Sequence, residues 1–144
     1  MEKLYAEFLL WVHRFHSGER YEELLDEMFL SDLNNEFLLE LEECSTNLLD
    51  TTGRFMHYWT YEHHELDVPM FGKYLFSGLE LAYKANDMNM EEFGRRCYLL
   101  WRDLPPSVDH TEPFLILCYA DDCLSYGDEA QTRSLYEKAF AFYD

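Results

Sequence analysis

Apolar side chains recur along this chain at the spacing of an α-helix. From residue 21 to 29 they follow an i, i+3, i+4, i+7, i+8 pattern on one helical face, formed by Tyr21, Leu24, Leu25, Met28 and Phe29. A second stripe covers four turns, with Leu33, Phe37, Leu38, Leu41, Cys44, Leu48 and Leu49. This second helix either continues past Asp50 with a kink at Gly53 or restarts there, and we favour continuation.

Capping residues indicate where other helices begin and end. A first helix is expected over about residues 2–16, apolar on most of its surface and ended by Gly18. Asp67, with Pro69 in the first turn, is expected to cap a helix that runs to about Ala85. Asn89 is followed three residues later by Glu92, which resembles a capping box.

The same signals place the rest of the chain. The helix after Asn89 is expected to end near Arg102, before the break at Pro105–Pro106; another is expected from Thr111 to near Gly127, and Asp128 caps the last. No stretch alternates apolar and polar residues in the manner of a β-strand. We therefore predict one all-α domain over residues 1–144, with about six or seven helices in antiparallel hairpins, as a bundle or a short repeat array.

The C-terminal half contains a degenerate internal repeat. A shift of 38 residues aligns Leu81–Ala82 with Tyr119–Ala120, Ala85 with Cys123, and Tyr98 with Tyr136; Gly127–Asp128 and Tyr136–Ala139 add a turn and a second helix. Over residues 75–144 this pattern resembles two hairpins of the tetratricopeptide-repeat (TPR) family, although Thr132 and Leu135 stand where the family has small residues. The resemblance implies a scaffold that binds proteins rather than an enzyme.

Charge gives the strongest indication of a partner. The chain has 29 Asp and Glu against 11 Lys and Arg, a net charge of −18. Residues 19–50 hold eleven acids and a single base, Arg20, and residues 109–129 hold six acids with no Lys or Arg. Such a surface disfavours direct binding to nucleic acid or to an anionic membrane, because both require a cationic face. A basic protein is the natural counterpart.

We therefore predict a non-enzymatic, acidic binding module that neutralises a basic protein. The concrete case is a bacterial toxin-immunity or inhibitor protein, directed for example against a nuclease toxin; a nucleic-acid mimic is not separable from it. Aromatic side chains beside the acids would supply buried anchors. The predicted partner-binding residues are Glu22, Glu23, Asp26, Glu27, Glu36, Glu40, Glu43, Trp59, Tyr61, Asp121 and Asp122.

Two alternatives remain open. One is a TPR-like adaptor that binds a peptide or helix in a groove. The other is a metal-dependent enzyme that uses the cluster His57, Glu62, His63, His64, Glu65 and Asp67, whose residue types suit a metal although their spacing matches no familiar site.

The remaining chemistry of the sequence indicates no catalysis. It contains no phosphate loop, no nucleophile elbow and no Cys-x-x-Cys zinc motif, so we expect no cofactor, no metal and no catalytic residue. Without a secretory signal or an apolar run that could span a bilayer, we expect a cytoplasmic protein whose four cysteines are reduced.

Overall fold

The computed structural model describes residues 1–62 and 64–144. Within them the protein is all helical, as predicted, with eight α-helices, one 3-10 helix (η1) and no β-strand. The α-helix count exceeds the six or seven expected. The elements are α1 (Glu2–Val12), α2 (Glu19–Ser31), α3 (Glu36–Glu43), α4 (Leu48–Thr60), α5 (Val68–Ala85), α6 (Met90–Arg102), α7 (Ile116–Tyr119), η1 (Ala120–Tyr126) and α8 (Glu129–Ala141).

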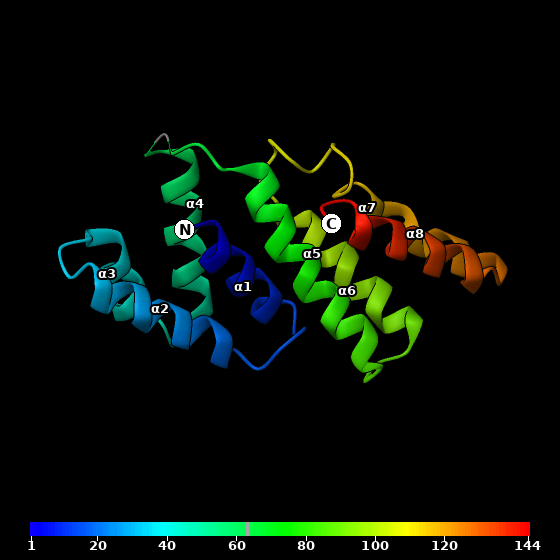
Figure 1. Cartoon of the computed structure of the whole chain (residues 1–144), viewed down its shortest axis with the longest axis horizontal. Helices are drawn as coiled ribbons and strands as arrows, with labels where there is room; N and C mark the ends of the chain where they lie inside the picture. Colours follow the sequence, from blue (N-terminus) through cyan, green and yellow to red (C-terminus); the bar gives the residue numbers. More distant parts are fainter. Residues whose placement is uncertain (63) are drawn as a thin grey trace.

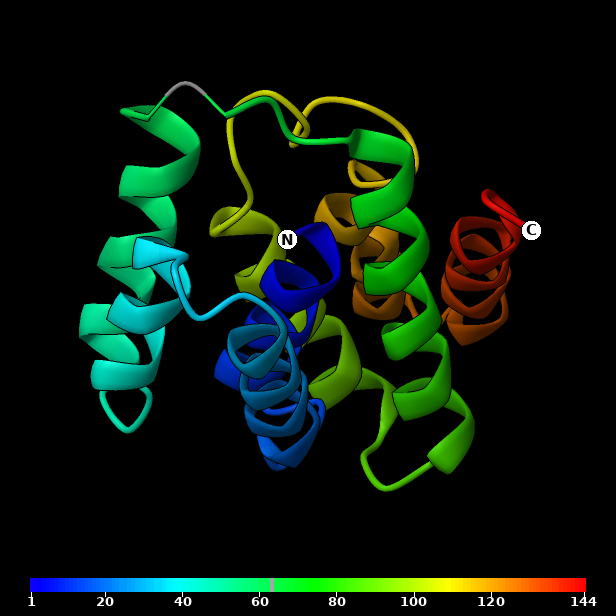
Figure 2. The same cartoon turned by 60° about the vertical axis from the view of Figure 1, so that its left-hand side comes forward.

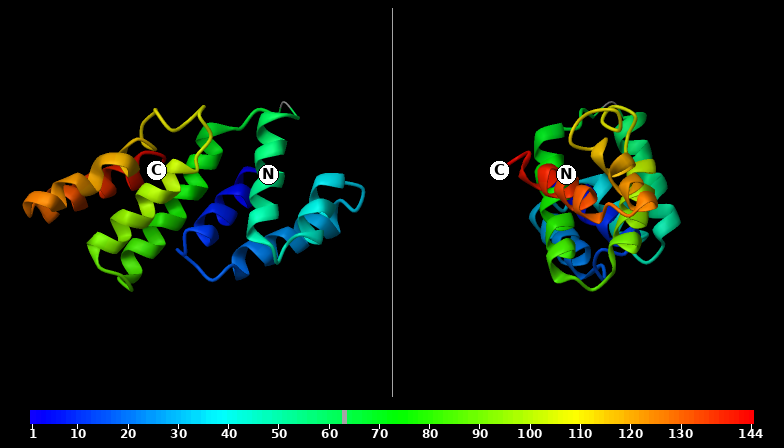
Figure 3. Two further views of the ribbon diagram at one scale, coloured as in Figure 1. Left: turned by 180° about the vertical axis from the view of Figure 1, so that it is seen from behind. Right: turned by 90° about the vertical axis from the view of Figure 1, so that its right-hand side faces the viewer.

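The helices form an elongated stack. In Figure 1, α2, α3 and α4 lie at one end, and α7, η1 and α8 lie at the other. The turned view of Figure 2 and the rear view of Figure 3 place α1 and α5 between these ends. Tyr5 stacks on Phe71 and Leu10 approaches Gly78, so α1 and α5 run in the same direction. This parallel pair is a departure from a simple series of antiparallel hairpins.

The core is one continuous cluster of buried apolar side chains that draws on α1 to α8. Helix α1 is central, as expected, because its residues from Leu4 to Leu10 are buried except for Glu7. No helix in the described part of the chain has the length and apolar character needed to cross a bilayer.

The first helix is shorter than predicted. It ends at Val12 rather than near residue 16, because Arg14 adopts a left-handed conformation with φ of 64°. Gly18 then takes a φ of 95°, which favours glycine. Between them the Nδ1 atom of His16 accepts a hydrogen bond from the Gly18 N–H, and its Nε2 atom lies 2.9 Å from Glu7 Oε2. These contacts stabilise a turn instead of another helical turn.

The second apolar stripe is divided between two helices. The break lies at residues 44–47, not at Gly53, so the expected continuous helix is wrong. The Asn47 side chain caps α4 by accepting from the Asp50 N–H at 3.1 Å, while Gly53 sits inside α4. Leu33, in the turn between α2 and α3, and Leu49, on α4, belong to the apolar stripe in the sequence but are 63% and 82% exposed.

Local capping signals predict the starts of helices more accurately than the apolar stripes do. Asp67, Asn89 and Asp128 cap α5, α6 and α8 by accepting from the backbone N–H three residues ahead, at 3.1, 2.9 and 3.0 Å. Residues 111–127 form turns, α7 and η1 instead of one helix. Where α7 ends and η1 begins, the Thr132 hydroxyl donates to the Ala120 carbonyl at 2.7 Å. This hydrogen bond occupies a carbonyl that would accept from a backbone N–H if the α-helix continued.

The two halves of the internal repeat align best at an offset of 39 residues, one more than the 38 expected from the sequence. The caps Asn89 and Asp128 are 39 residues apart. The 38-residue offset pairs Tyr98 with Tyr136, but Tyr98 is exposed and Tyr136 is buried. An offset of 39 instead matches the buried positions Phe93, Cys97 and Leu100 to Thr132, Tyr136 and Ala139.

Candidate functional site

The acids predicted on residues 22–43 are exposed on two helices at one end of the molecule, and we call this set the acidic face. Its residues stand on two neighbouring helices, α2 and α3, which pack side by side at one end of the molecule (Figures 1 and 3). On the α2 side, Glu23 and Glu27 line an open hollow together with Lys3 and Arg20. The predicted members, all exposed, are Glu22, Glu23, Asp26 and Glu27 on α2 and Glu36, Glu40 and Glu43 on α3. The half-buried Glu42, absent from the prediction, joins the face through Asp26.

Most of these carboxylates are free of internal ion pairs. In the described part of the chain, Glu40 alone among them pairs with a base, at 3.8 Å from Arg54 Nη1. Arg95 and Arg96, which could have neutralised the face, instead bind Glu92 on their own helix α6. Most of the carboxylates of the acidic face therefore lack an ion-pair partner within the described residues, although Lys3 and Arg20 lie near Glu23 and Glu27.

Asp26 and Glu42 form a contact between two like charges where α2 meets α3. Partial burial of the Glu42 carboxyl, together with its proximity to Asp26, raises the pKa of Glu42 to about 7. Beneath them the Tyr21 ring packs on Phe8 and Trp11 of α1, with its hydroxyl shielded from solvent. Near neutral pH the Glu42 carboxyl is therefore only partly ionised.

The raised pKa predicts a pH-dependent effect of Glu42→Gln. Because the folded protein holds the proton more tightly than the unfolded chain, the stabilising effect of Glu42 is present below about pH 4.5 and is lost as the pH rises through about 7. Above that pH we expect Glu42→Gln to be more stable than the wild type by about 1 kcal/mol, discounted for solvent screening. The difference should vanish at about pH 4, measured by urea unfolding, and a constant difference between the two pH values would contradict it.

Exposed leucines lie among the acids, and the sequence patterns do not predict them. Leu30 at the end of α2 and Leu39 on the outer side of α3 are exposed, and Leu33 lies in the turn between the helices. Leu39 shares its helical side with Glu36, Glu40 and Glu43. Leu30 and Leu39 stand outside the two apolar stripes, which is the signal that could have identified them. The acidic face thus carries its own apolar contact points.

The other predicted contact residues lie elsewhere. Tyr61, directly after α4, is exposed, whereas the Trp59 side chain is half-buried with its Nε1 atom shielded and without a hydrogen-bond partner in the described residues. Asp121 and Asp122 lie on η1 at the opposite end of the molecule from the acidic face (Figure 1). Burial and the charge of Asp122 raise the pKa of the half-buried Asp121. The structure therefore joins the acids of α2 and α3 but not these four residues.

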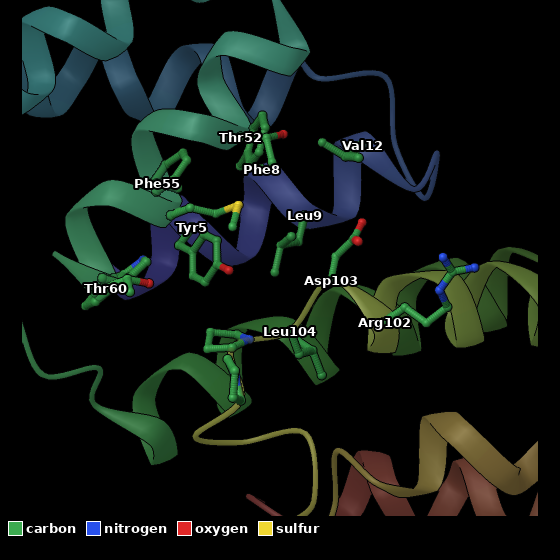
Figure 4. A pocket seen from close by; sticks show the side chains of 14 residues that line it. Tyr5, Phe8, Leu9, Val12, Thr52, Phe55, Thr60, Arg102, Asp103 and Leu104 are labelled. Atoms are coloured by element: carbon green, nitrogen blue, oxygen red, sulfur yellow. The ribbon is translucent and has the colours of Figure 1, made fainter.

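An apolar hollow lies between α1, α4 and the segment after α6 (Figure 4). Trp59 is one of its lining residues. The hollow has a volume of about 230 Å³, and Tyr5, Phe55 and Leu104 form much of its wall. A second hollow of about 420 Å³ shares Trp59, Thr60, Pro105 and Pro106 with it. Together they form an apolar groove, separate from the carboxylates of the acidic face.

The histidine-rich segment forms no metal centre in the described residues. No group of three or more His, Cys, Asp or Glu side chains within them could hold one ion. The His64 ring stacks on Tyr58 at 3.9 Å between centroids, and Asp67 caps α5. His63 of this cluster lies outside the described residues.

Comparison of the chain with protein-family models, curated protein sequences and solved structures found no significant match.

Proposed function

We propose that this protein is a cytoplasmic, non-enzymatic binding module that neutralises a basic protein partner through the acidic face. The observation that carries the proposal is that the predicted carboxylates of α2 and α3 are exposed. Of these carboxylates, Glu40 alone forms an ion pair within the described residues. A toxin-immunity or inhibitor protein is the concrete form. The partner's basic residues, such as those with which a nuclease holds phosphates, would pair with the carboxylates and become unavailable for catalysis.

The arrangement supports both capture and retention of such a partner. Acids concentrated at one end of a chain of net charge −18 attract a basic protein over several ångströms and accelerate association. Leu30, Leu33 and Leu39 offer apolar area that becomes buried on contact. These leucines take the anchoring role that the sequence analysis gives to Trp59 and Tyr61.

The proposal can be tested with a defined basic probe, an immobilised peptide of alternating arginine and leucine. We expect the triple variant Glu22→Gln, Glu23→Gln, Glu27→Gln to associate about tenfold more slowly than the wild type at low salt. A control triple, Asp87→Asn, Glu91→Gln, Asp144→Asn, changes the net charge equally at exposed positions outside the face. It should change the rate less than twofold; equal loss in both triples would show that only total charge matters.

The identity of the partner requires a biological test. If the protein is an immunity protein, a gene for a basic toxin should lie beside its own gene, and expression of this chain should protect cells from that toxin. The α2 triple variant should lose this protection while the control triple retains it. Protection that survives in the α2 triple would assign the neutralising surface to another part of the molecule.

The apolar groove favours a second candidate function, an adaptor that binds an apolar peptide or helix. Trp59 lines both hollows of this groove, so an occupant should alter its fluorescence. Binding of an apolar peptide that is unaffected by salt, and that is lost in Met56→Asp, would support the adaptor over the acidic face.

A further inference from the structure

A second charged feature lies where the end of α1 meets α6. An open hollow of about 270 Å³ is lined by Val12, His13, Arg14, Arg95, Arg96 and Leu99, which we call the arginine hollow. Three of the chain's eleven Lys and Arg residues thus converge on one hollow, and its lining in the described residues contains no carboxylate. In so acidic a chain, this is a local reversal of charge.

Two carboxylates next to the hollow partly balance these arginines, Glu92 on α6 and Asp103, whose Oδ2 atom lies 2.7 Å from His13 Nε2. Glu92 accepts from Arg95 Nε and Nη2 at 3.1 and 2.6 Å and from Arg96 Nε at 2.8 Å. These hydrogen bonds lower the pKa of Glu92 to about 2, so it stays ionised. Two carboxylates therefore face three guanidinium groups. More distant acids are largely screened beyond about 10 Å at ordinary ionic strength, so the local excess of positive charge decides what binds.

Two of the three arginines, Arg95 and Arg96, are oriented by hydrogen bonds before any ligand arrives. Arg96 Nη1 donates to the Arg14 carbonyl at 2.7 Å and so ties α6 to the turn after α1. Arg95 is oriented by its two hydrogen bonds to Glu92. This leaves Arg95 Nη1, Arg96 Nη2 and the Arg14 guanidinium without a hydrogen-bond partner in the described part of the chain. Because Arg95 and Arg96 are already oriented, their donors lose little entropy when they bind an anion.

We propose that the arginine hollow binds a compact oxyanion, namely the phosphoryl group of a small molecule. A phosphoryl group offers several oxygens to guanidinium groups and is attracted by the local excess of positive charge. Because the hollow is open, the rest of the molecule can remain in solvent. His13 lies at the edge, with its Nε2 atom 2.7 Å from Asp103 Oδ2, which keeps Asp103 engaged with the ring and fixes the wall of the hollow. The site is independent of the acidic face.

Titration calorimetry with inorganic pyrophosphate tests the site, with sodium chloride used to hold the ionic strength constant. We expect saturable binding of one anion per chain with a Kd on the order of 1 mM. Arg95→Gln should weaken binding about tenfold, because it removes a charge-assisted donor. Arg14→Asn should do the same, since asparagine tolerates the left-handed conformation of this position.

The matched control is Lys84→Gln, which removes one exposed positive charge on α5 and should bind pyrophosphate as the wild type does. Circular dichroism confirms that each variant folds. Wild-type protein that shows no saturable binding, or arginine variants that bind as tightly as Lys84→Gln, would overturn the site. A parallel titration with glycerol 3-phosphate distinguishes the two sources of the anion. If it binds at least as tightly as pyrophosphate, the ligand of the site is a phosphate ester. If it binds more weakly, the ligand is a free inorganic anion.

Discussion

Replacement of Phe55 by alanine is expected to lower the free energy of unfolding by about 3–5 kcal/mol. Phe55 lies on α4 and is buried where this helix meets α1 and α3. Its ring centroid is 5.1 Å from those of Tyr5 and Phe8 and 5.6 Å from that of Phe37. Removal of the ring leaves a cavity between three helices and deletes these aromatic contacts together.

Urea unfolding followed by circular dichroism measures this loss. The matched control is Met56→Ala, because Met56 is the next residue on the same helix and is 61% exposed. Its effect should stay within about 0.5 kcal/mol. A similar loss at both positions would mean that α4 is not attached to the core through Phe55.

The second large effect is expected at Gly78. This residue lies on α5 where the helix crosses α1, and a Cβ atom placed there would lie 2.3 Å from Leu10 Cδ1. Because Leu10 is fully buried, it has no open space into which to move. Gly78→Val should therefore destabilise the protein by about 2–3 kcal/mol, since overpacking separates the two helices.

Gly53 provides the contrast for Gly78. It also lies inside a helix, but a Cβ atom added to it would meet no atom of a neighbouring helix within 4 Å. Gly53→Ala should raise stability by about 0.5–1 kcal/mol, because alanine reduces the entropy lost when the helix forms. Thermal and urea unfolding of the two variants should move in opposite directions. A destabilised Gly53→Ala variant would restore the idea of a required kink at this position.

The sequence predicts features that depend on neighbouring residues better than features that depend on contacts between distant residues. Asp67, Asn89 and Asp128 are predicted as caps correctly, because a cap depends on a side chain and a backbone N–H only three residues away. The break before Asn47 escapes prediction because the apolar stripe continues across it at helical spacing. Capping at Asn47 and the contacts of Phe37 with Phe55 and Tyr58 favour two short helices over one long helix.

The candidate site shows the same division. Runs of acids on residues 22–43 are visible in the sequence, and the structure places them on neighbouring helices. The contact between Asp26 and Glu42 and the exposure of Leu33 depend on how α3 folds back on α2, which no local pattern encodes. The separation of Asp121 and Asp122 from this face likewise follows from the length of the helical stack.

By itself, the amino-acid sequence determined that this protein is helical, where most of its helices begin, and that it carries a large excess of negative charge. These properties depend on residue type and on spacing along one helix, so they are local or additive. Only the tertiary structure decided which acids meet, which leucines stay in solvent, and that Arg14 joins Arg95 and Arg96 around one hollow. Such groupings join residues that are distant in the sequence, and they depend on the packing of whole helices against one another.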